Sequence, residues 1–165
     1  MKQVLLITVM HSGTRFFLSV LEHGLKTKYL ELSEHPEGFN SLAFCHTWPE
    51  NRDVIERYIE SHNPVIVTCT REYGETAASW KKRNRRRSDL KAQLEEQEYF
   101  IAHYDPVVLS VDKPDREDRL SLLSEKIGVE LETDWRVIGS YAGIRTGKLM
   151  PTHDYESPLF AAVCK

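Results

Sequence analysis

The sequence predicts an α/β domain in three layers, with a mostly parallel β-sheet between two layers of helices. Three apolar, β-branched runs have the length and composition of buried strands in such a sheet: Val4–Val9, Val65–Cys69 and Pro106–Val111. Segments with helical periodicity separate these runs, and strands that alternate with helices imply βαβ units. The 165 residues contain no repeat and no linker, so we expect one domain over residues 1–165.

The first quarter of the chain predicts a strand, a helix and a weaker strand. Val4–Val9 is followed by a helix that Ser12 or Thr14 can cap. The apolar face of this helix consists of Phe17, Leu18, Leu21 and Leu25. Lys28–Leu32 is a weaker strand candidate, and residues 33–41 form a loop because they carry proline, glycine and asparagine.

The next elements are bounded by prolines. Leu42–Cys45 is a short apolar run that predicts another strand. Pro49 stands where proline is tolerated, at the first position of a helix, and Asn63-Pro64 ends that helix.

The remaining helices are expected from near Glu75, over Asp89–His103 and over Asp115–Ile127. Gly128 follows the last of them and is a typical C-terminal cap residue. Trp135–Lys165 has no clear periodicity.

Composition limits the class of protein. Cys45, Cys69 and Cys164 lack metal-ligand spacing, and the first two lie in apolar runs typical of buried free thiols in a reducing compartment. The N-terminal apolar run is shorter than the ~20 residues of a membrane span and has no signal-peptide cleavage site. We therefore expect a cytoplasmic protein without a membrane segment and without a metal ion.

One charged segment is dense enough to require an explanation. The formal net charge is −3, yet Lys81–Arg87 contains six cations in seven residues. This run is either a solvated helix end and turn, or a contact with an anion such as a nucleotide phosphate or an acidic partner. No motif for RNA or DNA recognition accompanies it, so nucleic acid is not an expected partner.

Three polar clusters follow predicted strands, where open α/β sheets bind ligands. His11–Arg15 contains Ser12, Gly13 and Thr14, and a glycine loop at the start of a helix attracts anions, although a structural turn with a helix cap is the alternative. Arg71 follows Val65–Thr70, with Ser79 eight residues later, and an arginine there can bind a phosphate. A surface salt bridge and an incidental serine are the alternatives for these two residues.

The third cluster is centred on His46, between a strand and a helix. A histidine can act as a general base because its pKa lies near neutrality, although a capping or core histidine is the structural alternative.

Together these segments resemble the sulfotransferases that use 3′-phosphoadenosine-5′-phosphosulfate (PAPS). In that family a loop of the form x-K/R-x-G-S/T-S/T holds the 5′-phosphosulfate, and Met10–Phe16 occupies that place. A later strand ends in an arginine that grips the 3′-phosphate together with a serine eight residues on, as in Val65–Trp80. Phe44–Pro49 is similar to the segment that carries the catalytic base, and Val107–Val111 and Arg119–Gly128 resemble the later strand and helix.

The resemblance covers about residues 1–135 and implies a P-loop-like, sulfotransferase-like fold. It implies transfer of a sulfuryl group from PAPS to a hydroxyl or amine of a small molecule or glycan, with 3′-phosphoadenosine-5′-phosphate (PAP) as the product. His46 would be the base. His11, if protonated, would stabilise the leaving phosphate together with Arg15 and the loop amides. Arg71 and Ser79 would anchor the 3′-phosphate.

The sequence also departs from the family. His11 stands where lysine or arginine is usual, and Arg15 is a candidate for the missing charge. Arg145 and Gly147 resemble a remnant of a C-terminal Arg-Lys-Gly segment that touches the 3′-phosphate.

Two other functions stay open. A small-molecule or nucleotide kinase would normally carry the G-x-x-x-x-G-K-S/T loop, whose lysine is missing here. A non-catalytic nucleotide-binding module of the same fold would be favoured by a neutral His11.

Overall fold

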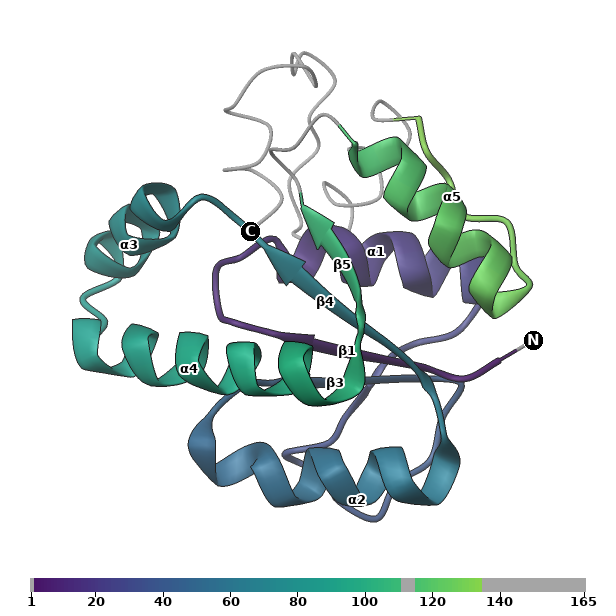
Figure 1. Ribbon diagram of the computed structural model, residues 1–165, viewed down its shortest axis with the longest axis horizontal. Helices are drawn as coiled ribbons and strands as arrows, with labels where there is room; N and C mark the ends of the chain where they lie inside the picture. The colour runs from purple at the N-terminus through teal and green to yellow at the C-terminus, as the bar shows by residue number, and fades with distance from the viewer. Residues whose placement is uncertain (1, 111–114, 135–165) are drawn as a thin grey trace.

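The computed structural model describes residues 2–110 and 115–134 and contains one five-stranded sheet in the order β2-β3-β1-β4-β5. All four strand pairings are parallel. The strands are β1 (Val4–Thr8), β2 (Leu30–Glu31), β3 (Leu42–His46), β4 (Val65–Thr70) and β5 (Val107–Ser110). The predicted parallel sheet is confirmed, with β1 at its centre (Figure 1).

Helices cover both faces of the sheet, as the three-layer prediction requires (Figure 1). The helices are α1 (Thr14–Leu25), α2 (Arg52–His62), α3 (Tyr73–Lys82), α4 (Arg87–Tyr104) and α5 (Arg116–Ile127). Helices α1 and α5 pack on one face, and α2 and α4 pack on the other. In the part of the chain that the structure describes, no helix is long and apolar enough to cross a membrane.

The alternation of side chains along β1 explains its continuous apolar sequence. Val4 and Leu6 belong to the core beneath α1 and α5, whereas Leu5 and Ile7 belong to the core beneath α2 and α4. All four side chains are fully buried. A strand buried on both faces has no position that favours a polar residue, so its sequence shows no alternation.

Several predicted boundaries differ from the structure. The N-terminal cap of α1 is Gly13, with no side-chain cap bond, so the expected cap by Ser12 or Thr14 is wrong. A single turn of 3₁₀-helix (Pro49–Asn51) precedes α2. Helix α4 begins at Arg87 and not at Asp89. The basic run Lys81–Arg87 therefore spans the end of α3, a turn, and the first residue of α4.

Candidate active site

A pocket of about 250 Å³ lies at the carboxyl ends of β1 and β3, where the sequence places its anion loop and its histidine. The loop after β1 and the first turns of α1 form one wall, and the β2 and β3 region forms another. The turn between α3 and α4 completes the pocket. The lining residues are Met10, His11, Gly13, Thr14, Arg15, Leu18, Tyr29, Glu31, Phe44, His46, Arg83 and Arg85.

The loop between β1 and α1 is bent by two residues with left-handed backbone. His11 has φ 66° and Gly13 has φ 101°. A side chain at position 13 would be strained, because only glycine adopts this conformation freely. The amides of Gly13 and Thr14 find no acceptor within the described residues. The start of α1 therefore presents N–H groups and the positive end of a helix dipole to the pocket.

The two loop hydroxyls are engaged inside the protein. Ser12 donates its hydroxyl to the carbonyl oxygen of Val9 at 2.7 Å, and its Oγ lies 3.3 Å from the sulfur of Cys69. Ser12 does not line the pocket. Thr14 Oγ1 lies 2.8 Å from the hydroxyl oxygen of Thr8, so Thr14 links the first turn of α1 to the end of β1. These bonds hold the loop in place before any anion binds.

His46 is held at the end of β3 in one orientation. Its Nδ1 lies 3.2 Å from the carbonyl oxygen of Thr8. Nδ1 also lies 3.3 Å from the hydroxyl oxygen of Thr8, and the roles of these groups depend on the tautomer of the ring. In the tautomer that donates to the carbonyl oxygen, Nδ1 carries the proton and Nε2 is left as an acceptor. Burial is the main cause that lowers the pKa of His46 to about 4, and the nearby Arg85 lowers it further. His46 is therefore neutral near pH 7, the state that a general base requires.

His11 is also neutral in this pocket. Burial, followed by the charges of Arg83 and Arg85 and then by His46 and Arg15, lowers the pKa of His11 to about 4. Its Nε2 is buried and has no hydrogen-bond partner within the described residues. The ring packs edge-on against Trp80, with 6.0 Å between the ring centroids.

Arg83, Arg85 and Glu31 are pocket residues that the sequence analysis did not assign. The two arginines lie in the basic run, whose composition was the available signal; which of its cations face the pocket depends on the turn. Glu31 comes from the edge strand β2, and Ser33 donates its hydroxyl to the carboxylate at 2.9 Å. Burial raises the pKa of Glu31. No local sequence signal distinguishes Glu31 from other surface carboxylates.

Arg71 and Ser79 lie outside this pocket. Arg71 follows β4, and its side chain is only 5% exposed. It forms an ion pair with Glu75, with 2.7 Å from Nε to the carboxylate, while Nη1 is buried without a partner in the described structure. Ser79 is half-buried one turn beyond Glu75 on α3. The two predicted anchors thus lie on either side of Glu75 along the chain, and among the described residues no hydrogen bond joins them.

The remaining predicted residues, Arg145 and Gly147, lie outside the described residues. Within residues 2–110 and 115–134, no group of three or more histidine, cysteine or acidic side chains is arranged to hold a metal ion.

Comparisons with known proteins identify the fold. No protein-family model and no curated protein sequence matches the chain. Among solved structures, the chain is similar to the mouse sulfotransferase SULT7A1 complexed with PAP, with a TM-score of 0.56 and 11% sequence identity. The similarity covers 86% of this chain and 63% of the mouse chain, which is less than two thirds of that protein. The chain has a sulfotransferase-like fold.

Proposed function

We propose that this protein is a sulfotransferase that moves a sulfuryl group from PAPS to a hydroxyl or amine of an acceptor. The observation that carries this proposal is the shared pocket of the glycine loop and His46. The loop offers unpaired amides to an anion, and the histidine offers a neutral ring nitrogen to a proton. Sulfuryl transfer needs both functions within one site. The fold shared with a PAP-bound sulfotransferase supports the same reaction class.

Two sets of unpaired donors, one in the pocket and one outside it, support binding of a nucleotide with phosphates at both ends. The unpaired amides of Gly13 and Thr14 suit the 5′-phosphosulfate, because a helix start binds anions. Nη1 of Arg71 is a buried donor without a partner, which suits a second anion such as the 3′-phosphate. Bound PAPS would supply the sulfuryl group, whose bond to the 5′-phosphate oxygen breaks while the acceptor oxygen or nitrogen bonds to sulfur.

His46 acts as the general base in this proposal. The hydrogen bond from Nδ1 to Thr8 fixes the ring and leaves Nε2 to accept the proton of the acceptor. A pKa of about 4 makes the ring a weak base in the empty pocket. A bound anion raises the pKa of a nearby histidine by Coulomb attraction, so donor binding moves His46 toward the basicity that proton transfer requires.

A non-catalytic nucleotide-binding module is the second candidate. The neutral His11 favours it, since a neutral ring cannot replace the usual lysine or arginine as a source of charge. The two candidates differ in one measurable respect. A module binds PAP without turning over PAPS, whereas an enzyme also releases PAP from PAPS with an acceptor or, slowly, with water.

The test is the substitution His46→Ala, measured for both turnover and binding. Loss of a general base lowers a rate by about 10²–10⁴-fold. We expect PAPS turnover to fall by this factor while the Kd for PAP changes less than about threefold, because phosphate contacts come from other residues. Turnover is followed as PAP release with a panel of hydroxyl and amine acceptors.

Arg71→Ala is the matched control, because it removes a proposed anchor and not the base. Arg71→Ala should mainly raise the Kd for PAP, and turnover should fall only because the donor binds more weakly. Absence of turnover in a wild-type protein that binds PAP would favour the binding module. Equal defects of the two variants in turnover and affinity would contradict the division of roles between His46 and Arg71.

A further inference from the structure

We propose that Arg83 and Arg85, in the turn between α3 and α4, supply the positive charge that the glycine loop lacks and bind the phosphosulfate end of the donor. This inference rests on the proposed function, because it assigns the donor's leaving group to these two side chains. They would neutralise the negative charge that develops on the 5′-phosphate oxygen as the sulfur–oxygen bond breaks.

The loop itself has little charge to offer. Position 11 is occupied by a histidine that is neutral in the pocket. Arg15 also lines the pocket, but it already interacts with another group of the protein. An anion at the start of α1 would therefore depend on the backbone amides and the helix dipole, neither of which carries a full positive charge. A doubly charged phosphosulfate needs a further cation close to the loop.

Trp80 fixes the backbone of the turn that carries Arg83 and Arg85, through its own backbone carbonyl and its buried side chain. The backbone amides of Arg83 and Arg85 donate to the carbonyl oxygen of Trp80 at 3.1 and 3.0 Å. The indole N–H of Trp80 in turn donates to the carbonyl oxygen of Met10 at 3.0 Å, and Trp80 is 2% exposed. Two hydrogen bonds thus join the turn to Trp80, and a third joins Trp80 to the loop after β1.

Asn84 sets the geometry of this turn. It adopts left-handed backbone with φ 53°, a conformation that asparagine tolerates better than most residues. Its amide donates to the carbonyl oxygen of Lys81 at 3.0 Å. This local bend lies between two arginines that both line the pocket.

The two guanidinium groups are close enough to act on the site and are not neutralised by acidic neighbours. Both lower the pKa of His11, and Arg85 also lowers the pKa of His46. No ion pair to a described carboxylate involves Arg83 or Arg85. Arg85 lies 5.9 Å over the ring of Trp80, which leaves its N–H groups available to an anion.

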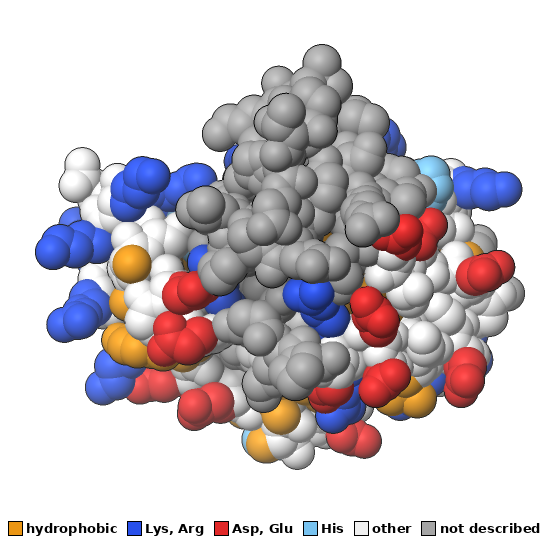
Figure 2. Space-filling model, turned by 90° about the horizontal axis from the view of Figure 1, so that it is seen from above, with side chains coloured by type: hydrophobic (Ala, Val, Ile, Leu, Met, Phe, Trp, Pro, Cys, Tyr) orange, Lys and Arg blue, Asp and Glu red, His pale blue; other side chains and the backbone are white. Residues whose placement is uncertain are grey.

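The rest of the basic run provides an internal contrast. All six cations of the run are exposed, and Figure 2 shows Lys and Arg side chains gathered on the α3 side of the molecule. Arg86 and Arg87 belong to the same turn and helix start, yet they do not line the pocket. A general electrostatic attraction would use all of these cations equally. Direct binding would use only Arg83 and Arg85.

The experiment compares two double variants of equal charge by calorimetric titration with PAP. In Arg83→Gln/Arg85→Gln we expect PAP to bind at least about tenfold more weakly, because charge-assisted hydrogen bonds are lost. PAPS turnover should fall further, since the two charges act most on the leaving group. In Arg86→Gln/Arg87→Gln both quantities should stay within about threefold of wild type. A melting curve for each variant separates a binding defect from unfolding.

Adding His11→Lys to the Arg83→Gln/Arg85→Gln variant should restore part of the PAP affinity and turnover, because lysine brings a cation back to the loop. Equal weakening in the two double variants, or no weakening in either, would overturn the inference while leaving the proposed function intact. A wild-type protein that does not bind PAP would overturn the proposed function, and the inference with it.

Discussion

The pocket and the contact between α2 and α4 use charged side chains in opposite ways. In the pocket, Arg83 and Arg85 stand beside two histidines and form no ion pair with a described carboxylate. Between α2 and α4, the charged groups bind one another. One region keeps charge available to a ligand, and the other uses charge to join two helices.

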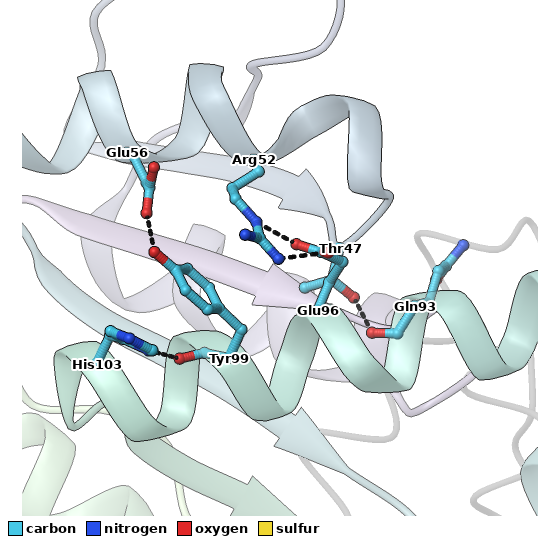
Figure 3. A network of polar contacts seen from close by, with 7 residues as sticks. All are labelled: Thr47, Arg52, Glu56, Gln93, Glu96, Tyr99 and His103. Carbon is cyan, nitrogen blue, oxygen red and sulfur yellow. Dashed lines mark hydrogen bonds and ion pairs between the residues drawn. The ribbon is translucent and has the colours of Figure 1, made fainter.

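The α2–α4 network is drawn in Figure 3. Arg52 donates to both carboxylate oxygens of Glu96, at 2.8 and 2.7 Å, and lies 4.0 Å over the ring of Tyr99. The carboxylate of Glu56 accepts the hydroxyls of Tyr99 at 2.6 Å and Tyr104 at 3.1 Å. Burial and the Glu56 carboxylate raise the pKa of Tyr104 to about 12, which keeps this hydroxyl protonated as a donor.

The two regions lead to different expectations for the loss of a charged side chain. In a bidentate pair the charge of the guanidinium is already balanced by a carboxylate, so it attracts an incoming anion less. An unpaired cation at a pocket wall has desolvated neighbours and free donors, so it gains more from an incoming anion. Substitutions in the network should therefore change stability alone, whereas substitutions of the pocket cations should change binding alone.

The largest effect is expected from Arg52→Ala. It leaves the carboxylate of Glu96, which is 10% exposed, without its partner. Because this pair is bidentate and its carboxylate is largely buried, we expect the free energy of unfolding to fall clearly more than for loss of an exposed ion pair. The free energy of unfolding is measured by urea denaturation. The Kd for PAP should not change.

Arg57→Ala is the control on the same helix. Its ion pair with Glu37 joins two exposed side chains at 3.3 Å, so its loss should cost no more than about 1 kcal/mol. If Arg57→Ala destabilises as much as Arg52→Ala, the network has no special structural role. A large loss of PAP affinity in Arg52→Ala would show that the α2–α4 network also affects ligand binding, contrary to this expectation.

Much of the fold could be predicted because its signals are local. Val4–Val9 and Val65–Cys69 are continuous apolar runs, and the structure buries both as parallel strands. The burial of Gln93 and Gln97 on α4 could not be predicted, because it depends on partners that are distant in the sequence. Gln93 accepts the amide of Met10 at 2.8 Å, and Gln97 donates to Thr68 at 2.8 Å. Such contacts do not appear in the periodic pattern of apolar residues along the sequence.

Some residues of the candidate site could be predicted from the sequence, but the contribution of Arg83 and Arg85 could not. The positions of His11, Gly13 and His46 after strands placed them at one edge of the sheet, and the structure brings them to one pocket. The inward direction of Arg83 and Arg85 follows from the turn at Asn84 and from Trp80. Neither feature has a sequence signature beyond the basic composition of the run.

A smaller effect is expected from pH, and it concerns the two histidines of the pocket. His11 and His46 have folded pKa values of about 4, below the ordinary value of 6.5. Between these values the unfolded chain binds more protons than the folded protein, so the free energy of unfolding falls as the pH drops from 6.5 toward 4. After allowance for solvent screening, we expect a loss on the order of 1–2 kcal/mol.

The measurement is a series of urea denaturation curves across this pH range. His46→Asn should show a shallower dependence, since one of the two titrating rings is gone. Glu31 acts in the opposite direction, because burial raises its pKa, and it is present in both proteins. An unchanged slope in His46→Asn would mean that His46 is not held neutral by the pocket.

Binding of a nucleotide with phosphates at both ends, one in the pocket and one at Arg71, is tested most directly by a calorimetric comparison of PAP, adenosine 5′-phosphate and ATP. PAP carries the 3′-phosphate that Nη1 of Arg71 would bind, and a charged hydrogen bond contributes about 1.5–3 kcal/mol. We expect PAP to bind at least about tenfold more tightly than adenosine 5′-phosphate and more tightly than ATP. Equal affinity for PAP and adenosine 5′-phosphate, or a preference for ATP, would contradict the account.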